Sequence, residues 1–338
     1  MEAGSTFAKF IYTTILNDTG TMRFINTMPK RFLHVFVLYV SLHSAAQQPS
    51  PRWISQSTFD EANGQLLLFG GAAHDTILND LWSFKNGKWT LLNNNGAPAK
   101  IKAALAYDSD RHCAVLFGGS GKQALMNDTW EWNGSAWKEI KITGPSPRNH
   151  PMAAYDLIHK CIVLFGGVGN AGLLTDTWTY NGNTWTKRDD TGPPGCLPQA
   201  LFYNEQRKKV MMVTLSSKPA SGNPGHSVNE LFEWTGNKWN NIHAPIITSS
   251  NLQSLCAFDK SGIMLFDGDD STDHKIKMNV YDGNSWHSSY VDGPSPRVGA
   301  AMVYDNVNHH VILFGGSNRV NFYNDTWVWD GTKWVKMN

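Results

Sequence analysis

The chain has 338 residues, with 29 Lys and Arg against 28 Asp and Glu, so its formal net charge is +1. This balance shows neither the strongly basic composition of many nucleic-acid-binding proteins nor an acidic tail. Hydrophobic residues make up 41% of the chain, which is enough to bury a sizeable core.

The first 46 residues predict export. Residues 1–27 carry no readable pattern and are interpreted as an upstream extension. Residues 28–46, which begin at Met28, contain two basic residues, an apolar run of 11 residues and then small residues. That order is typical of a secretory signal peptide, and the apolar run is too short to span a bilayer. We therefore expect a mature chain that starts near Gln47 and is secreted or periplasmic.

The rest of the chain, residues 47–338, is a tandem repeat. The segment from Val163 to Trp185 has close copies that begin at Leu67, Val115 and Ile312. Two degenerate copies lie between the Val163 segment and the copy that begins at Ile312. Its Phe position recurs as Phe69, Phe117, Phe165, Val213, Phe266 and Phe314, and its closing Trp as Trp89, Trp137, Trp185, Trp239, Trp286 and Trp334. A period of about 48 residues indicates a repeat architecture. The approximate repeats are 52–99, 100–147, 148–195, 196–250, 251–296 and 297–338.

Each repeat predicts four strands. In the third copy these are Asn149 to Tyr155, Cys161 to Phe165, Asp176 to Tyr180, and a strand that starts near Trp185. The second strand is continuously apolar, which suits burial on both faces. A glycine pair ends it, and glycine permits a left-handed turn or a close backbone approach. The repeat tryptophans, such as Trp130 and Trp137, are expected to wedge between neighbouring sheets and to dominate the packing.

An apolar strand that ends in Gly-Gly, followed by an aromatic residue and by a Trp about seven residues later, resembles the kelch repeat. The pairs are Trp82/Trp89, Trp130/Trp137, Trp178/Trp185, Phe232/Trp239 and Trp327/Trp334. The resemblance covers 52–338 and implies an all-β, six-bladed β-propeller with four antiparallel strands per blade and the first strand innermost. Because the repeats run in phase, we expect closure without a strand exchanged between the ends. A WD-type propeller lacks support because the repeats have no Trp-Asp endings.

In kelch propellers the loops after the Gly-Gly strands and the loops between blades share one face, which usually binds the ligand. A basic position in the inter-blade loop is occupied by Arg52, Lys100, Arg148 and Arg297, with Cys196 and Asn251 in the other two repeats. A ring of free cations there would attract carboxylates or phosphates. The alternative, which we favour, is internal pairing with an acidic position at Asp80, Asp128, Asp176 and Asp325, because buried charges normally need partners.

Other candidate binding residues lie in the loops of the same face. Repeat four carries a Pro/Gly/Ser loop, 216–229, with His226, and the loop of repeat five carries Asp269, Asp270 and His274. Asp and His suit a metal or a cationic ligand, although the spacing matches no calcium-loop pattern and a solvated acidic turn is the simpler interpretation. His74 and His150 also lie in predicted face loops. Long loops on a rigid scaffold often carry specificity.

No catalytic triad, paired-carboxylate motif, phosphate loop or zinc signature stands out, so we predict no catalytic residue, no metal and no cofactor. Cys113 and Cys161 begin equivalent strands 48 residues apart, and free, mostly buried thiols are expected. Two functions remain open. The first is a non-catalytic, monomeric module that binds a protein or carbohydrate, with no nucleic-acid partner and no membrane span. The second is a carbohydrate-active enzyme of the sialic acid mutarotase or epimerase type, ahead of a galactose-oxidase-like copper enzyme.

Overall fold

A computed structural model describes residues 15–16, 22–23, 47–189, 192–193, 196–216, 227–243, 247–249, 255–259, 262–267, 276–318 and 320–337. The chain divides into two compact units, Met1–Ala46 and Gln47–Asn338. In the first unit, the described residues form two short antiparallel strands, β1 (Ile15–Leu16) and β2 (Met22–Arg23). Within the described ranges, no helix is long and apolar enough to cross a membrane.

The described part of the second unit is all-β and contains six antiparallel sheets, each built on a path of four neighbouring strands. In chain order these blades are β3 (Gln56–Asp60), β4 (Gln65–Phe69), β7 (Leu81–Lys85), β8 (Lys88–Asn93); β9 (Ala104–Asp108), β10 (Cys113–Phe117), β11 (Thr129–Trp132), β12 (Trp137–Ile140); β13 (Met152–Asp156), β14 (Cys161–Gly169), β15 (Gly172–Tyr180), β16 (Trp185–Asp189); β17 (Cys196–Asn204), β18 (Lys209–Ser216), β19 (Ser227–Trp234), β20 (Trp239–Asn241); β22 (Leu255–Asp259), β23 (Gly262–Asp267), β24 (Ile276–Tyr281), β25 (Trp286–Val291); and β26 (Ala301–Asp305), β27 (His310–Phe314), β28 (Thr326–Trp329), β29 (Trp334–Met337). Short strands β5 (Ala72–Ala73) and β6 (Thr76–Ile77) form a separate hairpin, and β21 (Ile247–Ser249) pairs with β19.

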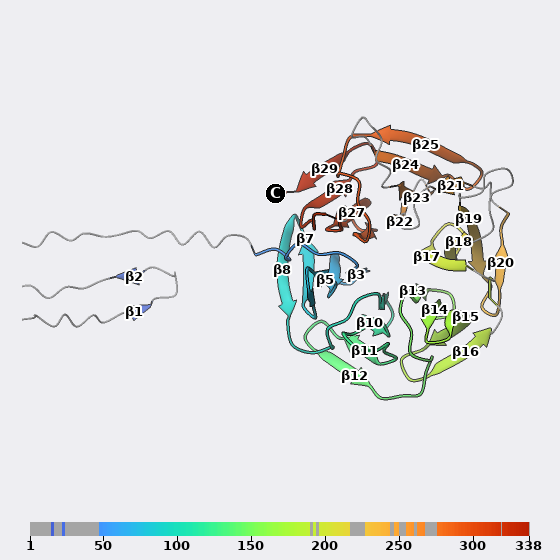
Figure 1. Ribbon diagram of the computed structural model, residues 1–338, viewed down its shortest axis with the longest axis horizontal. Coiled ribbons are helices and arrows are strands. Elements are labelled where there is room, and N and C mark those ends of the chain that lie inside the picture. The colour runs from blue at the N-terminus through green and yellow to red at the C-terminus, as the bar shows by residue number, and fades with distance from the viewer. Residues whose placement is uncertain are drawn as a thin grey trace, which may run out of the picture. The chain divides into compact units, whose positions relative to one another are not determined.

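The six blades are arranged around a central channel (Figure 1). The first strand of each blade is innermost, and each inner strand contacts the next in the order β3, β9, β13, β17, β22, β26 and back to β3. Each blade comes from one continuous segment, so the ring closes without an exchanged strand. The predicted six-bladed fold and its mode of closure are both confirmed.

The middle of the second strand of each blade is apolar because both of its faces are buried. In β4, Leu67 and Phe69 pack toward blade 2, whereas Leu66 and Leu68 pack toward blade 6. Strand residues alternate between the two faces of a sheet, so a blade between two neighbours needs apolar side chains at every position. The continuous apolar run is therefore the signature of a blade in the middle of a stack.

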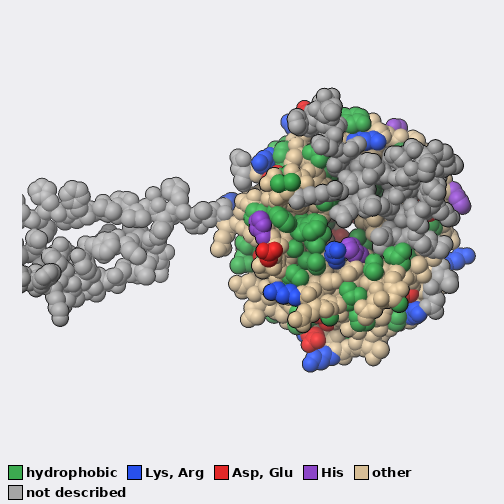
Figure 2. All heavy atoms as spheres, in the orientation of Figure 1, with side chains coloured by type: hydrophobic (Ala, Val, Ile, Leu, Met, Phe, Trp, Pro, Cys, Tyr) green, Lys and Arg blue, Asp and Glu red, His purple; other side chains and the backbone are tan. Residues whose placement is uncertain are grey.

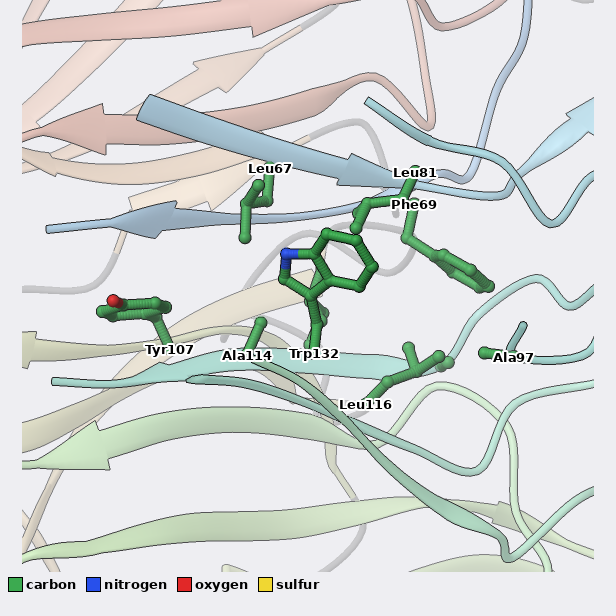
Figure 3. Packing of buried hydrophobic residues seen from close by; sticks show 10 residues of the cluster. Leu67, Phe69, Leu81, Ala97, Tyr107, Ala114, Leu116 and Trp132 are labelled. Carbon is green, nitrogen blue, oxygen red and sulfur yellow. The ribbon is translucent and has the colours of Figure 1, made fainter. Parts of the chain in front are cut away.

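Blades 1 and 2 show this packing in detail (Figure 3). Trp132 of β11 lies between the two sheets, against Leu67 and Leu81 of blade 1 and the inner part of blade 2. Tyr107 lies at one end of the cluster with its hydroxyl group pointing away from Trp132 (Figure 3). The Trp132 side chain is only 2% exposed, so it contributes nearly its whole apolar surface to the contact.

The closing Trp of each repeat joins its blade to the preceding one. In five repeats its ring contacts the Phe that ends the second strand of the preceding blade, with centroid distances of 4.7 Å for Trp89–Phe314, 5.4 Å for Trp137–Phe69, 5.1 Å for Trp185–Phe117, 5.8 Å for Trp239–Phe165 and 6.1 Å for Trp334–Phe266. The sixth, Trp286, packs in one cluster with Val213. The predicted wedging of these residues is confirmed. The indole N–H of Trp185 also donates to Thr129 Oγ1 of the preceding blade at 3.0 Å.

The same indole–threonine bond forms from Trp89 to Thr326 and from Trp239 to Thr177, both at 2.9 Å. In blade 1 the equivalent residue is Leu81, and the indole N–H of Trp137 has no hydrogen-bond partner. The residue at this threonine position therefore decides whether the indole N–H of the next blade's closing Trp has a threonine hydroxyl as its hydrogen-bond acceptor.

We predict that Thr129→Val, which keeps the side-chain shape, lowers the free energy of unfolding by about 1–3 kcal/mol, because it leaves the buried indole N–H of Trp185 unpaired. Leu81→Thr is the matched control, since it supplies an acceptor beside Trp137, and it should be close to neutral. Urea unfolding followed by tryptophan fluorescence measures both changes. Equal losses in the two variants would show that volume at this position matters more than the hydrogen bond.

Candidate functional site

The four cations that recur in the inter-blade loops are buried and paired. Their nitrogens lie 2.7 Å from Asp80 (Arg52), 2.7 Å from Asp128 (Lys100), 2.6 Å from Asp176 (Arg148) and 2.5 Å from Asp325 (Arg297). Each cationic side chain is at most 1% exposed. Internal pairing, the interpretation favoured from the sequence, is confirmed for these four repeats, and the four charges do not form a free ring.

Arg148 shows how completely the guanidinium is used. Its two terminal nitrogens bind both carboxylate oxygens of Asp176, at 2.6 and 3.0 Å. The remaining N–H groups donate to the Gly166 carbonyl, and to the carbonyl and hydroxyl oxygens of Ser146, all at 3.0 Å. Arg52 and Arg297 repeat this pattern with Ser50 and Ser295. The serine of each Ser-Pro-Arg sequence therefore supplies hydrogen-bond acceptors for the guanidinium of the arginine two residues later.

The aspartate of each pair also accepts a hydrogen bond from the first Trp of its repeat. The Trp178 indole donates to Asp176 Oδ2 at 2.7 Å, and Trp82, Trp130 and Trp327 donate in the same way in their blades. Burial on its own raises the pKa of Asp176, but its bonds with Arg148 and Trp178 outweigh burial and hold the pKa below its ordinary value. The Asp-Thr-Trp pattern thus helps to keep the carboxylate ionised beside the cation.

The backbone of the same cations connects neighbouring blades. Arg148 N donates to the Met126 carbonyl at 3.0 Å, and Gly119 N donates to the Arg148 carbonyl at 2.8 Å. Gly119 is left-handed, with φ 94°, and a Cβ there would lie 2.8 Å from the Ile101 carbonyl oxygen. Between blades 6 and 1 the equivalent bond runs from Gly316 N to the Arg52 carbonyl at 2.8 Å. The glycine pair therefore permits the next blade's cation to dock by its main chain.

Two residues beyond each cation, the chain turns in a left-handed conformation beside the channel. Ile54, Lys102, His150 and Gly299 have φ values of 49°, 56°, 53° and 63°. His150 N donates to the Lys102 carbonyl at 2.8 Å, and Ile54 N donates to the Gly299 carbonyl at 2.6 Å. These bonds between neighbouring blades place the His150 and Lys102 turns side by side. Sequence reasoning identified His150 but missed Lys102, which the two-residue offset from Lys100 would have revealed.

His150 is held neutral at ordinary pH. Burial and the positive charge of Lys102 lower its pKa to about 4. Its Nδ1 lies 2.9 Å from Asn149 Oδ1. A neutral imidazole with such a low pKa accepts a proton poorly at pH 7, so His150 suits hydrogen bonding to a ligand better than general-base catalysis.

An aromatic group occupies the Gly-Gly loops of blades 1 and 6. The Phe322 ring lies 4.9 Å from the ring of His74 and 6.2 Å from the ring of Trp53. Val320, in the same loop as Phe322, is 81% exposed. We call Trp53, His74, Val320 and Phe322 the loop-face patch. The face of the ring seen in Figure 2 shows several groups of hydrophobic side chains between scattered charged ones.

The remaining predicted residues contribute no contacts to this description. His226, Asp269, Asp270 and His274 lie outside the described residues. Across the part of the chain that the structure describes, there is no group of three or more His, Cys, Asp or Glu that could hold a metal ion. Cys113 and Cys161 are free and buried, as predicted, and burial raises their pKa values to about 12 and about 11. These two thiols are therefore poor nucleophiles.

A family model described as the KLHDC2/KLHL20/DRC7 Kelch-repeats domain matches residues 38–202. The chain has a kelch-type β-propeller fold. Among solved structures, this kelch propeller is similar to one titled "Structure of YjhT", with a TM-score of 0.62 and 14% sequence identity over 86% of this chain and 99% of that chain. At this identity the likeness shows the fold alone. No curated protein matches the chain.

We predict that Arg148→Ala lowers the free energy of unfolding by about 3–5 kcal/mol, because it leaves the Asp176 carboxylate without its cation. Arg148→Lys is the matched control, since blade 2 of the kelch propeller uses Lys100 at this position, and it should lose a smaller part. Urea unfolding with linear extrapolation measures both. An Arg148→Ala variant as stable as the parent would contradict a structural role for the pair.

We also predict a pH dependence from His150. In the unfolded chain the His150 side chain has its ordinary pKa of 6.5, whereas in the folded protein its pKa is about 4. Between these two pH values the unfolded chain therefore binds a proton that the folded protein does not bind. Stability therefore falls by up to about 3 kcal/mol as pH drops through this window. His150→Asn, which tolerates the left-handed backbone, should flatten the profile in denaturant unfolding between pH 7 and 4. His309→Asn, at an exposed left-handed position, is the control and should keep the parental slope.

Proposed function

We propose that this kelch propeller is a non-catalytic interaction module that binds a protein partner through the loop-face patch. The observation that carries the proposal is the contrast between the two kinds of side chain on this face. The recurring cations are buried in complete ion pairs, whereas Trp53, Phe322 and Val320 present aromatic and apolar surface. Aromatic side chains and a depletion of free charge are the compositional signal of the core of an interface.

The loop that carries the patch is shaped in advance. Asn318 Oδ1 accepts the backbone N–H groups of Val320 and Asn321, at 3.1 and 2.7 Å. Ser317 bridges to Phe322 and to Val298, so the base of the loop is fixed to its own blade. A preorganised loop loses little conformational freedom when a partner binds, and this supports a recognition role.

The second candidate is a carbohydrate-active enzyme of the mutarotase type. One feature favours it, a histidine and a lysine side by side at the channel mouth, since opening of a sugar ring needs proton transfer. The geometry supports it less well. Arg148 is saturated by Asp176, and the low pKa of His150 makes it a weak base. We therefore place binding ahead of catalysis.

The matched pair Val320 and Val307 tests the interaction surface. Both valines are exposed in blade 6, but Val320 follows β27 and Val307 precedes it, so they lie at opposite ends of the blade. We predict that Val320→Asp weakens partner binding at least tenfold, about 1.4 kcal/mol, and that Val307→Asp leaves it unchanged. Affinity would be measured by biolayer interferometry on a partner identified by cross-linking. Equal behaviour of the two variants would place the interface elsewhere.

A ligand panel separates the two candidate functions. The protein is heated with sialic acid, neutral sugars and acidic oligosaccharides, and a ligand at 100 times its dissociation constant should add about 2.7 kcal/mol of stability. A rise with an acidic sugar that is lost in His150→Asn would favour the carbohydrate-active candidate. No rise with any sugar, together with capture of a partner that depends on Val320, would favour the protein-binding module.

We further propose that the propeller is exported, with residues 28–46 acting as a signal peptide. The supporting observation is the order of basic, apolar and small residues in that segment. Mass spectrometry of the amino terminus of secreted protein should give a start near Gln47, and a start near Met1 would contradict export by this route.

A further inference from the structure

The hairpin turn between β11 and β12 projects into open space. These are the two outer strands of blade 2 (Figure 1). The turn consists of residues 133–136, Asn-Gly-Ser-Ala, and all four are exposed. Gly134 is left-handed, with φ 93°, and no described residue other than its chain neighbours has an atom within 4 Å of a Cβ built there. The turn is therefore accessible to an enzyme that modifies one of its side chains.

The oxygen of the Asn133 side chain is fully used, and its nitrogen is not. Asn133 Oδ1 accepts the backbone N–H groups of Ser135 and Ala136, at 3.0 and 2.9 Å, and the Ser135 hydroxyl at 2.8 Å. Asn133 Nδ2 has no hydrogen-bond partner among the described residues. A free amide nitrogen and a serine hydroxyl therefore lie beside each other in one accessible turn.

Residues 133–135 match Asn-x-Ser/Thr, the acceptor pattern for N-linked glycosylation in secreted proteins. Two more matches lie among the described residues, at 127–129 and 324–326, and both read Asn-Asp-Thr. Their aspartates pair with buried cations of the blade joint. Their threonines are only 3% and 4% exposed, and each accepts an indole N–H from the next blade. The fold therefore uses the other two patterns for its own contacts and leaves the one at 133–135 accessible.

We propose that Asn133 is an N-linked glycosylation site. The inference rests on the proposed export, because the transferase and its glycan donor act on chains that enter the secretory route. Asn133 Nδ2 would form a bond to the anomeric carbon of an oligosaccharide that is carried on a polyprenyl diphosphate. The bond between this carbon and the diphosphate oxygen breaks, the polyprenyl diphosphate leaves, and Nδ2 loses one proton. The step needs no oxidant or reductant.

The fold accommodates the product at this position. The transfer keeps the carbonyl of the Asn133 amide, so Oδ1 still accepts its three hydrogen bonds. Trp132, at the end of β11, pairs with Ala114 near the start of β10, whereas Gly118 follows the other end of β10. The turn and the Gly-Gly loop thus lie at opposite ends of blade 2. A glycan on Asn133 therefore leaves the loop-face patch free for a partner.

A reciprocal exchange between equivalent turns of blades 2 and 6 tests the proposal. Asp330 Oδ1 accepts the N–H groups of Thr332 and Lys333, at 2.8 and 2.9 Å, and the Thr332 hydroxyl at 2.7 Å. This turn has the same hydrogen bonds as the Asn133 turn but no amide nitrogen. Asn133→Asp should therefore keep the fold and lose the glycan. Asp330→Asn, which creates an Asn-Gly-Thr pattern, should gain one.

The full chain and both variants are produced in cultured animal cells, and the secreted proteins are analysed by peptide mass spectrometry before and after treatment with peptide-N-glycosidase. We expect a glycan on Asn133 in most parent molecules. The glycosidase converts a glycosylated Asn to Asp, so the treated parent and Asn133→Asp should have the same denaturant midpoint, which controls for folding. A secreted parent whose Asn133 is unmodified would overturn the proposal.

Protein purified from its natural source gives a second and independent test. Its peptide spectrum should show the same glycan on Asn133, and its amino terminus reports export separately. A start near Gln47 with an unmodified Asn133 would overturn the glycosylation site and leave export intact. A start near Met1 with an unmodified Asn133 would overturn both.

Discussion

The ring depends on the buried ion pair in the inter-blade loop. A guanidinium that is almost completely removed from water is tolerable only if its charge and all its N–H groups find partners. Arg148 meets this condition through Asp176, Ser146 and the Gly166 carbonyl within its own blade. Its main chain meanwhile binds the preceding blade through Met126 and Gly119. One residue thus fixes the end of a second strand, the start of a third strand and the junction between two blades.

The repetition of this joint explains how the propeller closes without an exchanged strand. Blade 6 meets blade 1 through the same contacts that join blades 2 and 3, namely the Arg52 main chain against Gly316 and Tyr323, and Trp89 against Phe314 and Thr326. The closing junction therefore needs no special covalent or strand-swapped device. Lys100 shows that the joint tolerates a simpler cation, although burial lowers the pKa of this ammonium group and it has only Asp128 as a side-chain partner.

Because the recurring cations are used for the joint, chemistry is left to residues that the repeat does not specify. On the Gly-Gly side these are the loop-face patch and the His150 and Lys102 turns. At the other end of the channel they are Glu61 and Glu205, which lie near four repeat tyrosines in the lining of one cavity. The scaffold thus has two separate surfaces with different chemistry, one aromatic and apolar, and one acidic with tyrosine hydroxyls.

The sequence by itself determined the number of blades, their boundaries, the strand order and the partner of each buried cation. These properties follow from a periodic pattern, and a period repeats every local contact in every copy. Only the tertiary structure decided which polar atoms have no hydrogen-bond partner and which residues from different blades lie close together. That the indole N–H of Trp137 lacks a partner, that Glu61 and Glu205 line one cavity, and that Phe322 packs against both His74 and Trp53 all depend on residues from different blades. Such contacts depend on the distances between blades, which the repeat pattern of a single blade does not encode.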